Sequence, residues 1–292
     1  IDQLTVPGRV ELRLAGGILY CANEGSTFGA EGIRAVTHAF LSSKKDEKIG
    51  RFGLGFKSVL GVTDHPQIIS RSVSFGFNGS DARAHFDDLS YRPARVPTLR
   101  VPSVLDPTAI ANDDHNVAEM MNWAATIIRL PLVRGGQRLY ERLKDFDVRY
   151  LLFPDLLARV DITVDRMGTR SFRRHPGPTR DSVNLEDSRG NATTWRVLHR
   201  EHVVSPRVRS NLPGLFDRDR VRVSYALQPG QPFRELGRFW AWFPLSDETT
   251  ASGIFNAPWH VNDDRTSMLP GSALNAELLG VVSREGGRLF PP

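Results

Sequence analysis

The stretch LSSKKDEKIGRFGLGFKSVLGVTD, residues 41–64, is the most informative part of the sequence. A Ser-Ser-Lys segment is followed by a charged spacer and then by a turn with glycines at positions 50, 53 and 55. The turn leads directly into a helix-like segment that begins at Phe56. Glycine lets the backbone approach a ligand closely, and the free N–H groups at a helix start favour anions. The pattern therefore predicts a phosphate-binding turn.

The glycine spacing excludes two common phosphate-binding loops. A Walker loop requires G-x-x-x-x-G-K-[ST], whereas Gly55 is followed here by Phe56 and Lys57. A dinucleotide-binding turn requires G-x-G-x-x-G after a strand, whereas this turn follows a charged run at residues 44–48. The order G-x-x-G-x-G-F instead resembles the second glycine box of the GHKL ATPases, which include gyrase, a heat-shock chaperone, histidine kinases and mismatch-repair ATPases. In that superfamily the box closes the ATP lid over the phosphates. Taken alone, the turn could also be a flexible helix start.

Two further segments resemble GHKL boxes in the expected order. An apolar run at residues 17–22 ends at Asn23-Glu24-Gly25, which resembles the first box, D-x-G-x-G. Asn23 stands where the family has its adenine-binding acid, and an amide oxygen can still accept from an exocyclic amine. The β-branched run at residues 125–132 resembles the family's closing strand, whose threonine near adenine is matched by Thr126. Taken singly, the first segment is an ordinary turn and Thr126 an ordinary strand residue.

The amino-acid sequence at residues 49–71 and 255–265 is similar to that of bacterial sacsin-like members of this superfamily. The resemblance implies binding of ATP or ADP with Mg²⁺. The residues that it assigns to the nucleotide are Asn23, Gly25, Ser43, Lys44, Gly50, Gly53, Leu54, Gly55, Phe56, Lys57 and Thr126.

The resemblance assigns no catalytic residue within this chain. The family's general base and Mg²⁺ ligand come from a helix, roughly E-L-x-x-N-A-x-D-A, that precedes the first strand. Residues 1–15 supply neither group, so we expect a fragment that hydrolyses ATP only if such a helix lies upstream. Arg265 is the expected phosphate sensor from a second domain; the alternative is that it pairs with Asp263 or Asp264 and holds its own loop together.

The alternation of strand-like and helix-like segments predicts an α+β fold. The resemblance implies a two-layer α/β sandwich of the GHKL type over residues 1–154, followed by a β-rich, transducer-like domain over residues 155–292. Strands are expected at residues 10–14, 18–22, 67–70, 72–77, 126–132, 160–164, 193–198, 221–227 and 236–243. Helices are expected near residues 30–41, from residue 56, and near residues 116–123, 135–157 and 274–284.

Composition limits the setting of the protein. A chain of 292 residues can hold two domains, and its single cysteine excludes an internal disulfide and fits a reducing cytosol. There is no apolar run of the roughly 18 residues that a membrane span needs, so we expect a cytoplasmic protein that does not cross a membrane. The excess of arginine over lysine indicates a GC-rich bacterial genome.

Three functional interpretations remain open. The favoured one is an ATP-binding module of a larger, chaperone-like, sacsin-like protein. Bound nucleotide would switch the conformation of this module, and the larger protein would act on an unidentified protein client. A non-hydrolysing interaction scaffold is the second interpretation, and a homodimer is left open for both. A nucleic-acid-linked factor in defence or repair is the third, because residues 166–222 hold 13 arginines against six acidic residues. A solvated arginine-rich surface explains the same excess.

Overall fold

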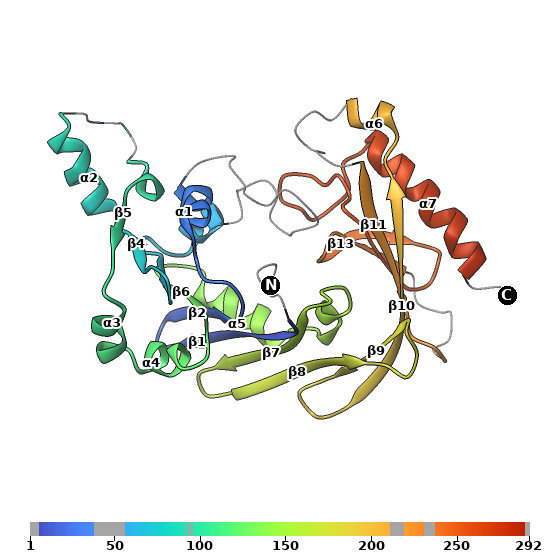
Figure 1. Ribbon diagram of the computed structural model, residues 1–292, viewed down its shortest axis with the longest axis horizontal. Coiled ribbons are helices and arrows are strands. Elements are labelled where there is room, and N and C mark those ends of the chain that lie inside the picture. Colours follow the sequence, from blue (N-terminus) through green and yellow to red (C-terminus); the bar gives the residue numbers. More distant parts are fainter. Residues whose placement is uncertain are drawn as a thin grey trace. The chain divides into compact units, whose positions relative to one another are not determined.

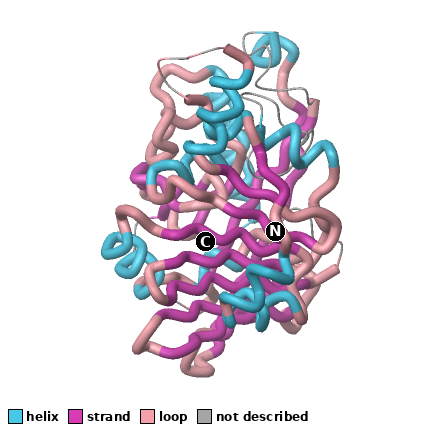
Figure 2. The backbone as a smooth tube through the Cα atoms, turned by 90° about the vertical axis from the view of Figure 1, so that its left-hand side faces the viewer, coloured by secondary structure: helices cyan, strands magenta, loops and turns pink. Residues whose placement is uncertain are grey.

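The computed structural model describes residues 6–37, 56–90, 92, 94, 96–210, 219–230 and 237–289. Helix accounts for 29% of the chain and strand for 36%, so neither type dominates and the fold is mixed α/β, which agrees with the expected α+β class. Helices and strands both occur throughout the described chain (Figure 2). The chain divides into two compact units, Ile1–Asp147 with Asp155–Arg173 and Val148–Pro154 with Arg174–Pro292.

The first unit is built on strands in the order β8-β7-β1-β2-β6-β3-β4-β5. β1 and β7 are parallel, and every other neighbouring pair in this order is antiparallel. The strands are β1 (Gly8–Ala15), β2 (Ile18–Asn23), β3 (Gln67–Ser70), β4 (Phe75–Phe77), β5 (Pro102–Val104), β6 (Thr126–Pro131), β7 (Leu157–Val164) and β8 (Gly168–Pro176). Gly16 and Gly17 join β1 to β2 with φ of 56° and 76°, the conformation that a tight type I′ hairpin turn requires.

Helices cover both faces of this sheet (Figure 1). On one face α4 (His115–Met121) packs Val117 and Met120 against Tyr20 and Ile127. On the opposite face α1 (Ala30–Thr37) and the 3₁₀ helix η1 (Phe56–Gly61) pack against β3 and β4. The remaining elements of the unit are α2 (Gly79–Asp88), the 3₁₀ helix η2 (Thr98–Arg100), α3 (Pro107–Asp113) and α5 (Gly136–Lys144).

The second unit has its strands in the order β13-β12-β14-β11-β10-β9. β12 and β14 are parallel, and the other neighbours are antiparallel. The strands are β9 (Ser182–Glu186), β10 (Ala192–Val203), β11 (Arg220–Leu227), β12 (Gly237–Trp240), β13 (Pro244–Thr249) and β14 (Ile254–Asn256).

One long helix covers the second unit's sheet. α7 (Ala273–Leu289) lies along β10 and β11, and α6 (Pro206–Ser210) precedes β11 (Figure 1). Leu274, Leu278 and Val281 recur at helical spacing and pack into a core with the β11 and β14 side chains. The 3₁₀ helix η3 (Val148–Leu151) also belongs to this unit, where Tyr150 lies 5.6 Å from the ring of Trp240.

The expected strands at residues 10–14, 18–22, 67–70, 160–164 and 221–227 all form. The helix expected from Phe56 is a six-residue 3₁₀ helix. The compact units group Asp155–Arg173 with the first unit, because β7 pairs with β1 along most of its length. The expected domain division between residues 154 and 155 stays a prediction.

Candidate functional site

Three polar residues form one row across neighbouring strands of the first unit. Asn23 on β2 faces Thr126 on β6, and Thr126 faces Ser70 on β3. Directly opposed residues of antiparallel strands point their side chains to the same face. The register therefore brings the two predicted adenine-site residues, Asn23 and Thr126, together on one face, with Ser70 beside them.

Ser70 is the centre of the hydrogen bonds in this row. Its hydroxyl oxygen lies 3.1 Å from Oγ1 of Thr126 and 3.1 Å from the carbonyl oxygen of Ala125. The amide of Phe28 donates to Ser70 Oγ at 3.1 Å, and Ser72 Oγ donates to the Phe28 carbonyl at 2.5 Å. The segment after Gly25 is thus held against the end of β3. Ser70 was not predicted as a site residue from the sequence, although a polar residue at the end of an otherwise apolar strand was a usable signal.

The turn after β2 fixes the orientation of Asn23. Asn23 Nδ2 donates to the carbonyl oxygen of Glu24 at 2.7 Å, which leaves the amide oxygen as the accepting end of the side chain. The carboxylate of Glu24 accepts from the backbone amide of Arg9 at 2.8 Å, and the Glu24 amide donates to the Arg9 carbonyl at 3.1 Å. Gly25 has a φ of 117°, a backbone conformation that side-chain-bearing residues rarely adopt.

The predicted phosphate residues Ser43, Lys44, Gly50, Gly53, Leu54 and Gly55 lie outside the described residues, as does the side chain of Lys57. The elements that precede and follow residues 38–55 are α1 and η1. Phe56 and Leu60 of η1 and Ile33 and Val36 of α1 pack with Ile68 in one core. Ile68 shares its sheet face with Ser70, because side chains two residues apart on a strand point the same way. Both elements therefore lie on the face that carries the polar row.

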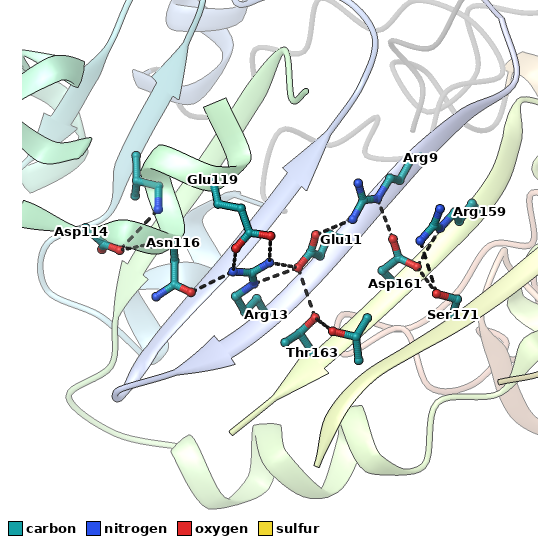
Figure 3. A network of polar contacts seen from close by, with 12 residues as sticks. Arg9, Glu11, Arg13, Asp114, Asn116, Glu119, Arg159, Asp161, Thr163 and Ser171 are labelled. Atoms are coloured by element: carbon teal, nitrogen blue, oxygen red, sulfur yellow. Dashed lines mark hydrogen bonds and ion pairs between the residues drawn. The ribbon is translucent and has the colours of Figure 1, made fainter. Parts of the chain in front are cut away.

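A second polar cluster lies on the opposite face of β1 and β7 (Figure 3). Glu11 and Asp161 are register partners on these parallel strands and are only 1% and 0% exposed. Arg9 bridges them, with Nε donating to Asp161 at 2.6 Å and a terminal nitrogen donating to Glu11 at 2.8 Å. Two adjacent buried carboxylates would repel each other strongly, and the positive charge of Arg9, which contacts both, offsets this repulsion.

Arg9 donates to one oxygen of each carboxylate, and the other oxygen of each accepts two hydrogen bonds from other side chains. Glu11 Oε1 accepts from Arg13 at 2.8 Å and from Thr163 at 3.2 Å. Asp161 Oδ1 accepts from Arg159 at 2.8 Å and from Ser171 at 2.6 Å. Burial opposes ionisation of Asp161. The hydrogen bonds from Arg159 and Ser171 and the charges of Arg9 and Arg159 outweigh this effect, so the pKa of Asp161 lies below its usual value. The pair therefore stabilises the pairing of β1 with β7.

The cluster continues onto α4. Arg13 donates to Glu119 at 2.7 Å and to Asn116 at 2.9 Å, and the bond from Arg13 is the main reason that the pKa of Glu119 is lowered. Arg9 also stacks on Trp123, with its guanidinium carbon 4.1 Å from the ring centroid. Because the backbone of Arg9 binds Glu24, this cluster and the Asn23 turn share an anchor.

Asp114 joins α4 to the sheet. Its side chain accepts from the Asn116 amide at the start of α4, from the Tyr20 hydroxyl at 2.8 Å and from Arg129 at 2.8 Å. Burial and the bond to Asp114 raise the pKa of Tyr20 to about 12. Asp114 is thus the N-cap of α4 and is buried between the helix and the sheet.

In the second unit, Arg265 lies in a tight loop closed by the bridge between Val261 and Met268. Its φ of 59° is left-handed, which is uncommon for a residue other than glycine. The Asp264 carboxylate accepts from the Thr266 amide at 2.9 Å and from its hydroxyl at 2.6 Å, so short polar side chains shape the loop. The expected role of Arg265 as a phosphate sensor stays a prediction.

The arginines of residues 166–222 do not all share a face. On β10, Arg196 and Arg200 lie four residues apart, so their side chains point to the same side of the sheet, whereas the side chain of His199 points to the other side. On β11, Arg222 is the register partner of Glu201 and points to the other side, where its Nε lies 3.4 Å from that carboxylate. The sheet register thus divides the local basic excess between two faces.

Among the residues that the structure describes, no group of three or more histidine, cysteine, aspartate or glutamate side chains is placed to hold a metal ion. Nor does any helix in the described part of the chain have both the length and the apolar character needed to cross a membrane.

Comparison with known proteins leaves the family open. No protein-family model matches the chain, and no curated protein matches it. A solved structure described as the N-terminal domain of a DNA repair protein aligns with 96% of this chain and 89% of its own, at 10% sequence identity and a TM-score of 0.40.

Proposed function

We propose that the first unit binds ATP or ADP, with the base against the row formed by Asn23, Thr126 and Ser70. The observation that carries this proposal is the strand register, which aligns Asn23 and Thr126 although they are far apart in the sequence. An oriented amide oxygen matches the exocyclic amine of adenine, and the hydroxyls of the row offer further donors and acceptors. The positive φ of Gly25 fits a position where a base approaches the backbone.

The phosphates are assigned to the segment between α1 and η1, which contains Ser43, Lys44 and the glycines at positions 50, 53 and 55. Its two flanking elements lie on the face that carries the row, and this supports placing base and phosphates in one site. Glycines and a lysine suit phosphate oxygens, because backbone N–H groups can approach them and an ammonium group offsets their charge. Bound Mg²⁺ would offset part of the phosphate charge, and its protein ligands are not assigned here.

We propose a nucleotide-dependent switch as the role of the module within a larger, cytoplasmic, sacsin-like protein. A ligand changes a conformation only through contacts that differ between two states, and phosphates bound by the segment 38–55 would supply such contacts. A non-hydrolysing scaffold is the alternative, since no catalytic base is assigned. Glu24, the acidic residue that follows Asn23 in the sequence, already accepts a hydrogen bond from the backbone amide of Arg9.

Calorimetric titration with ATP, ADP and adenosine tests the binding proposal. We expect saturable binding of both nucleotides, weaker binding of adenosine, and loss of nucleotide binding in Gly55→Trp, whose ring would fill the phosphate turn. Gly280→Trp is the matched control, because a Cβ at position 280 would meet nothing within 4 Å. Nucleotide affinity that survives Gly55→Trp unchanged would contradict the site. Phosphate release from ATP, measured on the same samples, distinguishes the two roles. Steady release indicates a switch that hydrolyses ATP, and its absence indicates a non-hydrolysing scaffold.

A further inference from the structure

A cavity in the first unit lies away from the polar row. It has a volume of about 720 Å³ and is bounded by one face of α2, the turn after η1 and the segment that contains η2. We call it the α2 groove; its lining includes Asp64, His65, Ser80, Arg83 and Thr98. His65 precedes β3, whereas Ser70 ends it, so about 16 Å of extended chain separates the groove from the row.

One face of α2 lines the groove, and small residues on this face leave space. The lining residues of the helix recur at helical spacing and are Gly79, Ser80, Arg83, Ala84 and Asp87, of which the glycine, the serine and the alanine are small. A Cβ at Gly79 would lie 3.7 Å from Thr98 Oγ1, so helix and η2 segment approach closely at this end. The volume lies within the range of small-molecule sites, roughly 300–1,000 Å³.

Both acids in the groove are already paired with arginines. Asp64 accepts from Arg134 at 2.7 Å, and Asp87 accepts from Arg92 at 3.0 Å. Arg83 also lines the groove, and no ion pair to it occurs among the residues that the structure describes. Arg134 and Arg92 lie outside the lining and neutralise the two lining aspartates, so Arg83 is the lining residue whose positive charge can attract a negatively charged group.

We propose that the α2 groove binds the phosphate or carboxylate group of a small-molecule ligand. Arg83 would form the charged contact, since a guanidinium group can donate two parallel hydrogen bonds to either anion. The hydroxyls of Ser80 and Thr98 line the same space and can donate to the remaining oxygens. Ser80 lies in the first turn of α2, whose positive end adds to the attraction. The proposal does not depend on nucleotide binding at the polar row.

The test is a calorimetric titration of the chain with inorganic pyrophosphate and, separately, with citrate. We expect saturable binding of at least one of them, and tighter binding of one identifies phosphate or carboxylate as the preferred group. Arg83→Ala should weaken this binding about tenfold or more. The substitution should not disturb folding, because Arg83 is exposed on a helix and alanine is a strong helix former.

Arg138→Ala is the matched control, since Arg138 is likewise an exposed helical arginine. Its anion affinity should equal that of the unsubstituted chain. Thr98→Val should weaken binding less than Arg83→Ala, because it removes a neutral donor only. Absence of binding by both anions up to about 10 mM would overturn the proposal. So would pyrophosphate binding that is lost in Lys44→Ala but kept in Arg83→Ala, which would assign the anion to the nucleotide site instead.

Discussion

The hydroxyl oxygens of Ser70 and Thr126 lie 3.1 Å apart on facing positions of β3 and β6. Both residues are buried, at 7% and 3% exposure, so their hydroxyls form part of a wall and not of a solvated surface. Buried hydroxyls that are paired in this way hold a fixed geometry, because an unpaired one would be costly. The pair therefore gives the proposed adenine site a defined edge.

Thr126→Val keeps the shape of the side chain and removes its hydroxyl. We expect ATP affinity to fall roughly tenfold and the free energy of unfolding to fall by about 1 kcal/mol, because one hydrogen bond is lost in each case. Calorimetry and urea unfolding measure the two effects. Thr169→Val is the matched control, since Thr163 and Thr169 form a similar hydroxyl pair, 2.9 Å apart, on β7 and β8. Equal losses of ATP affinity in both variants would show an effect through folding alone.

Asn23→Ala tests the choice of base. Adenine carries an amine where guanine carries a carbonyl oxygen, and only the amine can donate to the oriented oxygen of Asn23. We expect ATP affinity to fall about tenfold while GTP affinity changes little, which would lower the preference for adenine. Competition titrations with both nucleotides measure this ratio. If the affinities for ATP and GTP fall together, Asn23 acts on the turn and not on the base.

Lys44→Ala tests the phosphate end of the site. An ammonium group recognises phosphate charge and contributes nothing specific to the base, so ATP binding should weaken more than adenosine binding. Lys45→Ala and Lys48→Ala are the controls, because both residues are expected to be surface charges of the same segment. Equal losses for ATP and adenosine in Lys44→Ala would contradict a phosphate contact.

The sequence allowed part of this site to be predicted. Asn23 ends one recognisable strand and Thr126 begins another, so their local setting could be inferred from the pattern of the chain around them. Ser70 could not be placed beside Thr126, because strand order depends on which faces bury together and not on the local pattern of either strand. The groove at α2 depends on three segments whose packing the sequence does not specify.

The buried cluster on β1 was not predicted for a similar reason. The alternation at residues 10–14 correctly predicted a strand, and such a strand in an antiparallel sheet usually turns its polar side to water. Here Glu11 and Arg13 are buried, because β7 lies parallel to β1 and carries Asp161 and Thr163 in register. Pairing between strands this far apart in the sequence leaves no local signal. Matching polar residues at alternate positions of both strands were the only usable indication.

Arg9→Met tests the role of that cluster in stability. The substitution leaves Glu11 and Asp161 adjacent and buried with one fewer positive charge, so the free energy of unfolding at pH 7 should fall by about 3 kcal/mol. Urea unfolding measures the change. Arg92→Met is the control, because Arg92 and Asp87 form an exposed pair, and its loss should cost less than about 1 kcal/mol.

The effect of Arg9→Met should depend on pH in a defined direction. In the unsubstituted chain the pKa of Asp161 is lowered on folding, so its stabilising contribution is present above the unfolded value of about 3.9 and is lost as the pH falls below it. In the variant, protonation relieves the repulsion between the two buried carboxylates, so acid costs the variant less stability. The difference in unfolding free energy should therefore narrow between pH 7 and about pH 4. A difference that stays constant over this range would mean that Arg9 stabilises the unit through its packing on Trp123 and not through its charge.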